Sequence, residues 1–362
     1  MREYFVAFNC FSKIGPVRTK RLLDFFGNLE LAYKATRENL IQAKIETKIV
    51  DEFVVWRQTF DLEKYLGRLE KEDIKYVTIL DEDYPPLLFE IYGPPPLLYY
   101  RGTLECKGYF PLAVIGARKY SPYGERVVNE IIPSLINNKF CIISGLARGI
   151  DSLVHRATLL AEGKTWAVLG SGLDWKSIYP PENITLAREI INSDGAVFSE
   201  FPLGTAPLPI NFPLRNRIVA GMSKGTLVIE ARQKSGALIT ATYALEQNRE
   251  VLAVPGNIFL ETSAGPNDLI KSGAKVVTSA NDILELFAFV AGPEKNVART
   301  RVKPELDEME EKIYVVLSDL PMHINEIAQA TKLDTKNINS TLSMLELRGI
   351  IKNTGAGEYV LN

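Results

Sequence analysis

The chain has 362 residues, 46% of them hydrophobic, and its 42 lysines and arginines nearly balance 44 aspartates and glutamates, for a net charge of −2. This composition predicts a globular protein of more than one domain and excludes an overall basic field, so any site for a polyanion must be local. Two histidines exclude a histidine-rich metal site, and we expect no cofactor. Three widely spaced cysteines, no apolar stretch of membrane-spanning length and no signal-peptide pattern predict a cytoplasmic protein with no membrane partner.

Residues 1–105 are predicted to form an N-terminal helical domain followed by an extended, proline-rich connector. The run Ile14-Gly15-Pro16-Val17 lies between helical stretches and resembles a helix-hairpin-helix turn, whose backbone N–H groups face a phosphate. Positive charge beside it comes from Lys13, Arg18, Lys20 and Arg21. The alternative is a small helical domain whose hairpin only packs, since a single short turn motif has many chance matches.

The connector begins with a predicted strand, residues 75–80, and continues through two proline-punctuated stretches, 83–88 and 93–102, that favour extended chain. Its aromatic residues Tyr99 and Tyr100 suit either of two roles. They can stack on bases, or they can pack the connector onto the edge of a sheet. We expect packing, because that is the commoner use of such aromatics.

The central region, 106–292, contains short apolar runs that each end in a glycine-rich or polar loop. They lie at 112–115, 140–143, 166–169, 196–198, 226–229 and 251–254. Runs without alternation suit strands buried on both faces, and stretches with helical periodicity separate them. Strand and helix in repetition predict a Rossmann-like parallel sheet with helices on both faces. The loops then converge on a crevice at the carboxyl edge of the sheet, where such sheets bind ligands.

The charges of residues 111–292 nearly balance, at seventeen basic against sixteen acidic, but many basic side chains follow the predicted strands. Gly116, Arg118 and Lys119 open the first crossover, where Arg118 offers a bidentate contact to a phosphate. The second loop, Ser144 to Asp151, joins Ser144, Gly145, Arg148 and Gly149 to a helix N-terminus and so predicts an anion cradle.

The run from Asn211 to Gly221 places Phe212 beside Arg215, Asn216 and Arg217. A π-face beside cations and an amide is the combination that single-stranded nucleic acid requires. The alternative is that Phe212 is a core residue and the two arginines form internal ion pairs, and we expect one of these arginines to be structural. A third loop, Lys234-Ser235-Gly236, offers further phosphate contacts.

Enzymatic and cofactor-binding interpretations lack their motifs. The dinucleotide fingerprint G-x-G-x-x-G and the P-loop sequence are absent. A hydrolase triad of Ser144, His155 and Asp151 has no nucleophile elbow, so a structural contact between His155 and Asp151 is favoured.

The motifs in this order resemble the bacterial DNA-processing protein A (DprA/Smf) family. The residues that carry the resemblance are Gly116-Ala117-Arg118, Ser144 to Asp151, Asn211 to Arg217, Lys234-Ser235-Gly236 and Pro255-Gly256-Asn257. The resemblance implies a non-catalytic homodimer that binds and protects single-stranded DNA and loads RecA during natural transformation, with single-strand-binding protein as a further partner. It places DNA contacts on Arg118, on the loop from Ser144 to Gly149 and on Phe212. Some members carry a lysine before that aromatic, whereas this chain has Leu208-Pro209-Ile210-Asn211.

Residues 293–304 are predicted to form a linker, and residues 305–362 a winged helix with its wing around Gly355 and Gly357. This last region carries ten acidic and five basic residues. Such a balance repels a phosphate backbone. A protein-contact or regulatory role is therefore favoured over the reading of DNA.

Together these features predict a mediator of recombination that binds single-stranded DNA. The residues expected to contact DNA are Gly116, Arg118, Lys119, Ser144, Gly145, Arg148, Gly149, Phe212, Arg215, Asn216, Arg217, Lys234, Ser235 and Gly236. The alternative is a nucleotide-processing, phosphoribohydrolase-like enzyme in the same crevice with Glu230 or Glu200 as catalytic carboxylate, although its P-G-G-x-G-T run is missing. A transcriptional regulator whose winged helix reads duplex DNA is a third interpretation, which the acidic C-terminal region weakens.

Overall fold

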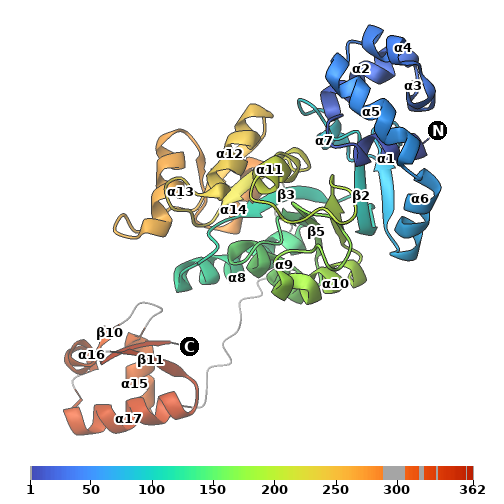
Figure 1. Ribbon diagram of the computed structural model, residues 1–362. Coiled ribbons are helices and arrows are strands. Elements are labelled where there is room, and N and C mark those ends of the chain that lie inside the picture. The colour runs from blue at the N-terminus through green and yellow to red at the C-terminus, as the bar shows by residue number, and fades with distance from the viewer. Residues whose placement is uncertain (1, 288–305, 318–321, 332, 356, 362) are drawn as a thin grey trace. The chain divides into compact units, whose positions relative to one another are not determined.

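The computed structural model of the protein describes residues 2–287, 306–317, 322–331, 333–355 and 357–361. The chain divides into two compact units, Met1–Val290 and Ala291–Asn362 (Figure 1). The predicted linker at 293–304 lies outside the described residues. Among the helices in the described ranges, none has the length and apolar character needed to cross a bilayer.

The first unit begins with a group of short helices. They are α1 (Glu3–Cys10), α2 (Pro16–Phe26), α3 (Leu29–Lys34), α4 (Arg37–Gln42), α5 (Thr47–Thr59) and α6 (Leu62–Lys71). Pro16 stands at the first position of α2, where its missing N–H is not needed, and Gly27 ends the helix with a left-handed φ of 77°. The predicted helical hairpin around Gly15 is therefore confirmed.

The basic residues beside this hairpin turn have partners in the same helical region. Lys13 pairs with Glu52, Arg18 with Glu46 at 2.8 Å, and Lys20 with Asp24 at 2.8 Å. The guanidinium of Arg21 donates to the carbonyl of Lys44. Each of the three ion pairs has a side chain that is at least half exposed, and such pairs contribute little, so contact of this turn with a phosphate stays a prediction.

One mixed sheet organises the rest of the first unit. Its strands are β1 (Lys75–Thr78), β2 (Leu97–Gly102), β3 (Phe110–Ile115), β4 (Phe140–Ser144), β5 (Lys164–Val168), β6 (Ala196–Ser199), β7 (Gly225–Val228), β8 (Glu250–Ala253) and β9 (Lys275–Val276). Their order is β1-β2-β6-β5-β4-β3-β7-β8-β9, and β3 to β9 run parallel. The predicted parallel sheet is thus confirmed for these strands.

Two antiparallel strands extend that sheet at the β6 edge. β2 pairs antiparallel with β6, and β1 pairs antiparallel with β2, so the connector supplies both. Tyr99 in β2 is buried, and Tyr100 lies 6.3 Å from Phe198 of β6 between ring centroids. The expectation that these tyrosines pack the connector onto the sheet is confirmed. The sheet is mixed because this antiparallel pair adds to the parallel strands.

Helices cover both faces of the sheet (Figure 1). They are α7 (Pro86–Phe89), α8 (Pro122–Asn137), α9 (Ile150–Leu160), α10 (Ile184–Asn192), α11 (Asn211–Gly221), α12 (Gly236–Glu246), α13 (Glu261–Lys271) and α14 (Ala280–Leu286), with a 3-10 turn at Pro181–Asn183. Leu112 and Val114 of β3 join an apolar cluster with α8, α9 and α14, whereas Ala113 and Ile115 join one with α11 and α12. Alternate residues of each strand are therefore buried on opposite faces.

The strand order creates a point where successive connections leave in opposite directions. From β3 the chain steps to β4, β5 and β6 on one side, and then returns through α11 to β7, β8 and β9 on the other. The loops after β3 and β7 diverge at this point. Open α/β sheets bind ligands in the crevice that such a switch leaves at the carboxyl ends of the strands.

The second unit contains a helix-turn-helix and a small sheet. Its described elements are α15 (Glu308–Val316), β10 (Met322–His323), α16 (Ile324–Thr331), α17 (Thr335–Leu347), β11 (Ile351–Gly355) and β12 (Glu358–Leu361). β11 and β12 form the hairpin expected of a wing, and β10 pairs with β12. Ile313, Ile327, Ile338, Leu342, Leu345 and Ile351 form its core. The predicted winged helix is confirmed.

Replacement of Phe53 by alanine is expected to lower the free energy of unfolding by about 3 to 5 kcal/mol. Phe53 is 1% exposed in α5 and stacks on Phe8 with ring centroids 5.0 Å apart. Val55 in the same helix is 67% exposed, so Val55→Ala should change the value by less than about 0.5 kcal/mol. Urea unfolding followed by circular dichroism measures both, and equal effects of the two substitutions would contradict the assigned core.

A basic crevice at the carboxyl edge of the sheet

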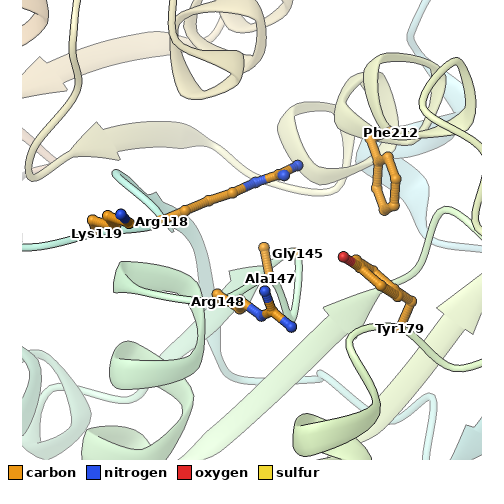
Figure 2. A pocket seen from close by; sticks show the side chains of 7 residues that line it. All are labelled: Arg118, Lys119, Gly145, Ala147, Arg148, Tyr179 and Phe212. Atoms are coloured by element: carbon orange, nitrogen blue, oxygen red, sulfur yellow. The ribbon is translucent and has the colours of Figure 1, made fainter.

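Two neighbouring cavities open where the parallel strands end. The larger, of about 790 Å³, is lined by the loops after β3, β4 and β7 and by residues of α11 and α12. The smaller, of about 200 Å³, is lined by Arg118, Lys119, Gly145, Ala147, Arg148, Tyr179 and Phe212 (Figure 2). They share most of these residues, and we refer to them together as the crevice. It lies at the predicted edge of the sheet.

Most of the residues predicted to contact DNA line the crevice. These are Gly116, Arg118, Lys119, Gly145, Arg148, Phe212, Arg215, Asn216, Lys234, Ser235 and Gly236. Ser144, Gly149 and Arg217 do not line it. The sequence pattern therefore located the loops correctly, and the structure separates residues that face the crevice from residues that support it.

An aromatic pair and a cation meet in the smaller cavity. The guanidinium carbon of Arg118 lies 5.7 Å from the ring centroid of Phe212, and the side chain of Arg118 extends toward that ring (Figure 2). The ring of Tyr179 lies 5.9 Å from that of Phe212, tilted by 53°. Phe212 is half-buried, so it is not a core residue. This group offers π-faces beside a charge, as an unstacked base requires.

Tyr179 was not among the predicted site residues. It belongs to the long loop between β5 and α10, which carries the side chain to the same edge of the sheet as Phe212. The signal available in the sequence was the presence of an aromatic residue after a strand that ends in Gly170-Ser171-Gly172. Only the fold shows which residue of that loop reaches the cavity.

Glycines let the first two loops pack against each other. Gly149 has a left-handed φ of 85°, and a Cβ there would lie 2.2 Å from the carbonyl oxygen of Ala117. A Cβ on Gly116 would lie 2.7 Å from the side chain of Ile150. Ile150 N–H donates to the Ala117 carbonyl at 3.0 Å. These glycines allow the two loops to pack closely, and Gly116 also lines the larger cavity.

The predicted anion cradle holds an internal carboxylate. Gly145 N–H donates to Asp151 Oδ2 at 3.2 Å, and the N–H groups of Ala147 and Gly116 also stabilise this carboxylate. Burial raises the pKa of Asp151, whereas Arg215 and these N–H groups oppose that rise. Ser144 is buried and its Oγ donates to the Val114 carbonyl at 2.7 Å. Gly145 N–H and the Ser144 hydroxyl therefore have partners within the protein, and contact of this loop with a phosphate stays a prediction.

Both arginines after Phe212 are structural, where one was expected to be. Arg215 is 4% exposed and donates to the carbonyls of Gly145 and Val168. Burial lowers its pKa to about 10, which leaves it charged at neutral pH. Arg217 forms an ion pair with Glu200 and donates to the Gly93 carbonyl at 3.0 Å. The alternative interpretation had both arginines in internal ion pairs and Phe212 in the core. The structure shows the ion pair for Arg217, backbone carbonyls as partners of Arg215, and a half-buried Phe212.

The charges that face solvent form a second group. Arg118, Lys119 and Lys234 are exposed. Arg148 pairs with Glu182 and Arg232 pairs with Glu261 at 3.2 Å, with all four side chains at least half exposed. Exposed pairs of this kind contribute little and exchange readily for another anion. Among the described residues that line the crevice, Asp151 is the only acidic one, and it belongs to the internal cradle.

The carboxylates proposed for a hydrolase are engaged elsewhere. Glu230 accepts hydrogen bonds from Ser121 N–H at 2.9 Å, Ser121 Oγ at 2.6 Å and Thr262 Oγ1 at 3.0 Å. Glu200 is partly buried and paired with Arg217, and neither glutamate lines the crevice. His155, which we expected to contact Asp151, instead lies 2.7 Å from Thr165 Oγ1, between Nδ1 and the hydroxyl. That expectation named the wrong partner.

Comparison with known proteins gives consistent matches. The family model for DNA recombination-mediator protein A matches residues 75–288, and that for the DprA winged helix domain matches residues 297–357. Protein Smf of Synechocystis is 34% identical over 99% of this chain and 98% of its own length. The DNA processing protein A structure from Streptococcus pneumoniae superposes with a TM-score of 0.68 at 34% identity, covering 78% of this chain and 97% of its own. That from Helicobacter pylori, a protein with a single-stranded DNA binding mode, gives 0.53 at 26% identity, covering 59% and 96%.

Arg217→Gln is expected to lower the free energy of unfolding by about 3 to 5 kcal/mol, because it leaves the carboxylate of Glu200 buried without its partner. Arg148→Gln breaks only an exposed pair and should leave stability unchanged. Chemical denaturation of both variants provides the comparison. If Arg217→Gln proved as stable as Arg148→Gln, the structural role assigned to Arg217 would be wrong.

A pH dependence is expected from His155, because burial lowers its pKa from the ordinary 6.5 to about 3. Between these values the unfolded chain binds a proton that the folded chain does not, so stability falls as pH drops. From about pH 7.5 to about pH 5.5 this residue should lower the free energy of unfolding by about 1.4 kcal/mol. Denaturation of wild type and His155→Gln at both pH values measures the difference. An equal pH response of the two proteins would refute the assignment.

Proposed function

The chain belongs to the DNA recombination-mediator protein A family, and on that premise we propose that it binds and protects incoming single-stranded DNA and loads RecA onto it during natural transformation. The proposed DNA binding rests on one observation: Arg118, Phe212 and Tyr179 lie together in the smaller cavity at the carboxyl edge of the sheet. Exposed basic side chains surround that cavity.

The geometry suits a single strand better than a duplex. The smaller cavity holds about 200 Å³ and is bounded by two aromatic rings, so a base must leave its stack to enter it. Bases of a single strand do so readily, whereas duplex bases are paired and stacked. Arg118, Lys119 and Lys234 are exposed around it and supply the charge that follows a phosphate backbone.

Binding without catalysis is part of the proposal. A nucleotide-processing hydrolase in the same crevice would need a carboxylate directed at its substrate. Glu230 and Glu200 are instead held by Ser121, Thr262 and Arg217. Asp151 accepts hydrogen bonds from the backbone of the two loops that contain Gly116 and Gly145. These contacts support a binding protein over the phosphoribohydrolase-like alternative.

The proposed partners follow from family membership and from multivalency. We propose a cytoplasmic homodimer, with RecA and single-strand-binding protein as protein partners. Two crevices on one dimer would engage one strand together, which raises avidity without any new contact. In the second unit, Arg348 forms an ion pair with Glu310 at 2.8 Å. The excess of acidic residues at 305–362 supports contact with a protein and not with DNA.

Single-strand binding is expected to depend on Arg118 and Phe212. Fluorescence anisotropy of a labelled oligo-dT and of its duplex counterpart, across a salt series, measures the affinity. Wild type should prefer the single strand and bind less tightly as salt rises. Arg118→Gln should weaken binding and reduce the slope of log K against log salt by about 0.7, whereas Phe212→Ala should weaken binding with the slope unchanged.

Arg156→Gln is the matched control, because Arg156 is an exposed arginine of α9 that does not line the crevice. It should leave both the affinity and the slope unchanged. If wild type showed no preference for single strands, or if Arg118→Gln bound as wild type does, the proposed function would fail. Hydrolysis of nucleoside monophosphates would then be the assay for the alternative. Loading of RecA onto coated single strands tests the mediator step separately.

A further inference from the structure

An exposed apolar run borders the crevice. It consists of Pro207, Leu208, Pro209, Ile210, Phe212, Pro213 and Leu214, in the loop before α11 and its first turn, and we call it the apolar platform. Leu208 is 53% exposed, Ile210 68% and Leu214 43%. Single exposed apolar residues are normal, but several together mark a surface that binds something.

The platform is held in a defined shape. Leu208 N–H donates to the Ala206 carbonyl at 2.8 Å, and Asn211 N–H donates to the Leu208 carbonyl at 3.0 Å. The amide of Asn211 also donates to Ala206 at 3.2 Å, and Asn211 is 6% exposed. Three prolines restrict the backbone further. The apolar side chains are thus presented to solvent on a braced loop, which reduces the conformational entropy cost of binding.

The platform continues the lining of the crevice. Pro207, Pro209, Phe212 and Pro213 line the larger cavity, and Leu208, Ile210 and Leu214 alternate with them along the chain. Other parts of the lining come from basic loops, with Arg118 and Lys119 after β3 and with Arg232 and Lys234 after β7. A ligand that satisfies both must be apolar on one side and anionic on the other.

We propose that the apolar platform contacts the bases of single-stranded DNA while the basic loops hold its phosphates, and that Ile210 and Leu214 carry the base contact beyond the crevice. This inference rests on the proposed function and adds the orientation of the strand to it. A single strand has base faces on one side and phosphates on the other, which matches the two chemistries of the lining. A protein partner or a second copy of this chain would need no anionic side opposite the platform.

The first test uses the exposed part of the platform. The double substitution Ile210→Ser with Leu214→Ser removes apolar surface without opening the core, because both side chains face solvent. Affinity is measured for oligo-dT and for an oligomer of the same length made of abasic deoxyribose phosphate. The double variant should bind oligo-dT about three- to tenfold more weakly, with an unchanged salt slope, and should bind the abasic oligomer as wild type does.

Two matched variants frame this result. Arg232→Gln with Lys234→Gln should weaken binding of both oligomers alike and lower the salt slope by about 1.4, because each phosphate that a side chain neutralises accounts for about 0.7 of the slope. Leu160→Ser replaces an 85% exposed leucine at the end of α9 and should change nothing. A further measurement needs no variant. A single abasic site is placed at each position of oligo-dT in turn, and the affinity of wild type is measured. Phe212 and Tyr179 receive one base, so a loss of affinity at more than one position is expected from the platform.

The outcomes separate this inference from the proposed function. If wild type binds oligo-dT but the platform variant binds it equally well, or binds both oligomers more weakly to the same degree, the inference is overturned and the proposed function stands. If light scattering gave the platform variant a different molar mass from wild type, the inference would also be overturned, because the platform would then be a contact with a second copy of the chain. If wild type does not bind oligo-dT, the proposed function itself has failed.

Discussion

The crevice depends on one buried charge, the carboxylate of Asp151. It accepts hydrogen bonds from the loop after β4, through Gly145 and Ala147, and from Gly116 in the loop after β3, and it faces the buried guanidinium of Arg215 from α11. Each of these charges would be costly to bury alone, and together with the backbone dipoles they compensate each other. This carboxylate joins the loop after β3, the loop after β4 and the helix α11. It therefore fixes the positions of Arg118, Arg148 and Phe212, which these three segments carry.

This arrangement divides the charges of the sheet edge into two populations. Asp151 and Arg215 are buried and the Arg217–Glu200 pair is partly buried, and these charges hold the loops in place. Arg118, Lys119 and Lys234 reach solvent, where an anionic ligand can meet them. The carboxylates near the crevice already have partners within the protein, which supports the proposal of binding without hydrolysis.

The lining of the crevice is mainly basic, whereas residues 305–362 are mainly acidic, which supports the different roles proposed for them. The crevice of the first unit combines aromatic, apolar and basic surfaces, which is what a flexible polyanion with exposed bases requires. Residues 305–362 have a winged-helix fold, but their ten acidic against five basic residues oppose contact with a phosphate backbone. The winged-helix fold is common among proteins that read duplex DNA, but it does not by itself assign that role, because function follows from the site and not from the architecture.

The amino-acid sequence by itself determined the architecture: the buried strands, the loops at their carboxyl ends, the helical hairpin and the winged helix. These features are local, since run length, periodicity and the positions of glycine and proline specify them. It did not determine the partner of each arginine. Arg148, Arg215 and Arg217 have the same chemistry in the sequence. Yet Arg148 is exposed, Arg215 is buried against carbonyls, and Arg217 is partly buried against Glu200. The antiparallel β1–β2 pair and the approach of Tyr179 to Phe212 also required the tertiary structure. In each case the deciding contact joins segments distant in the chain, and burial sets its energy, so no local pattern encodes it.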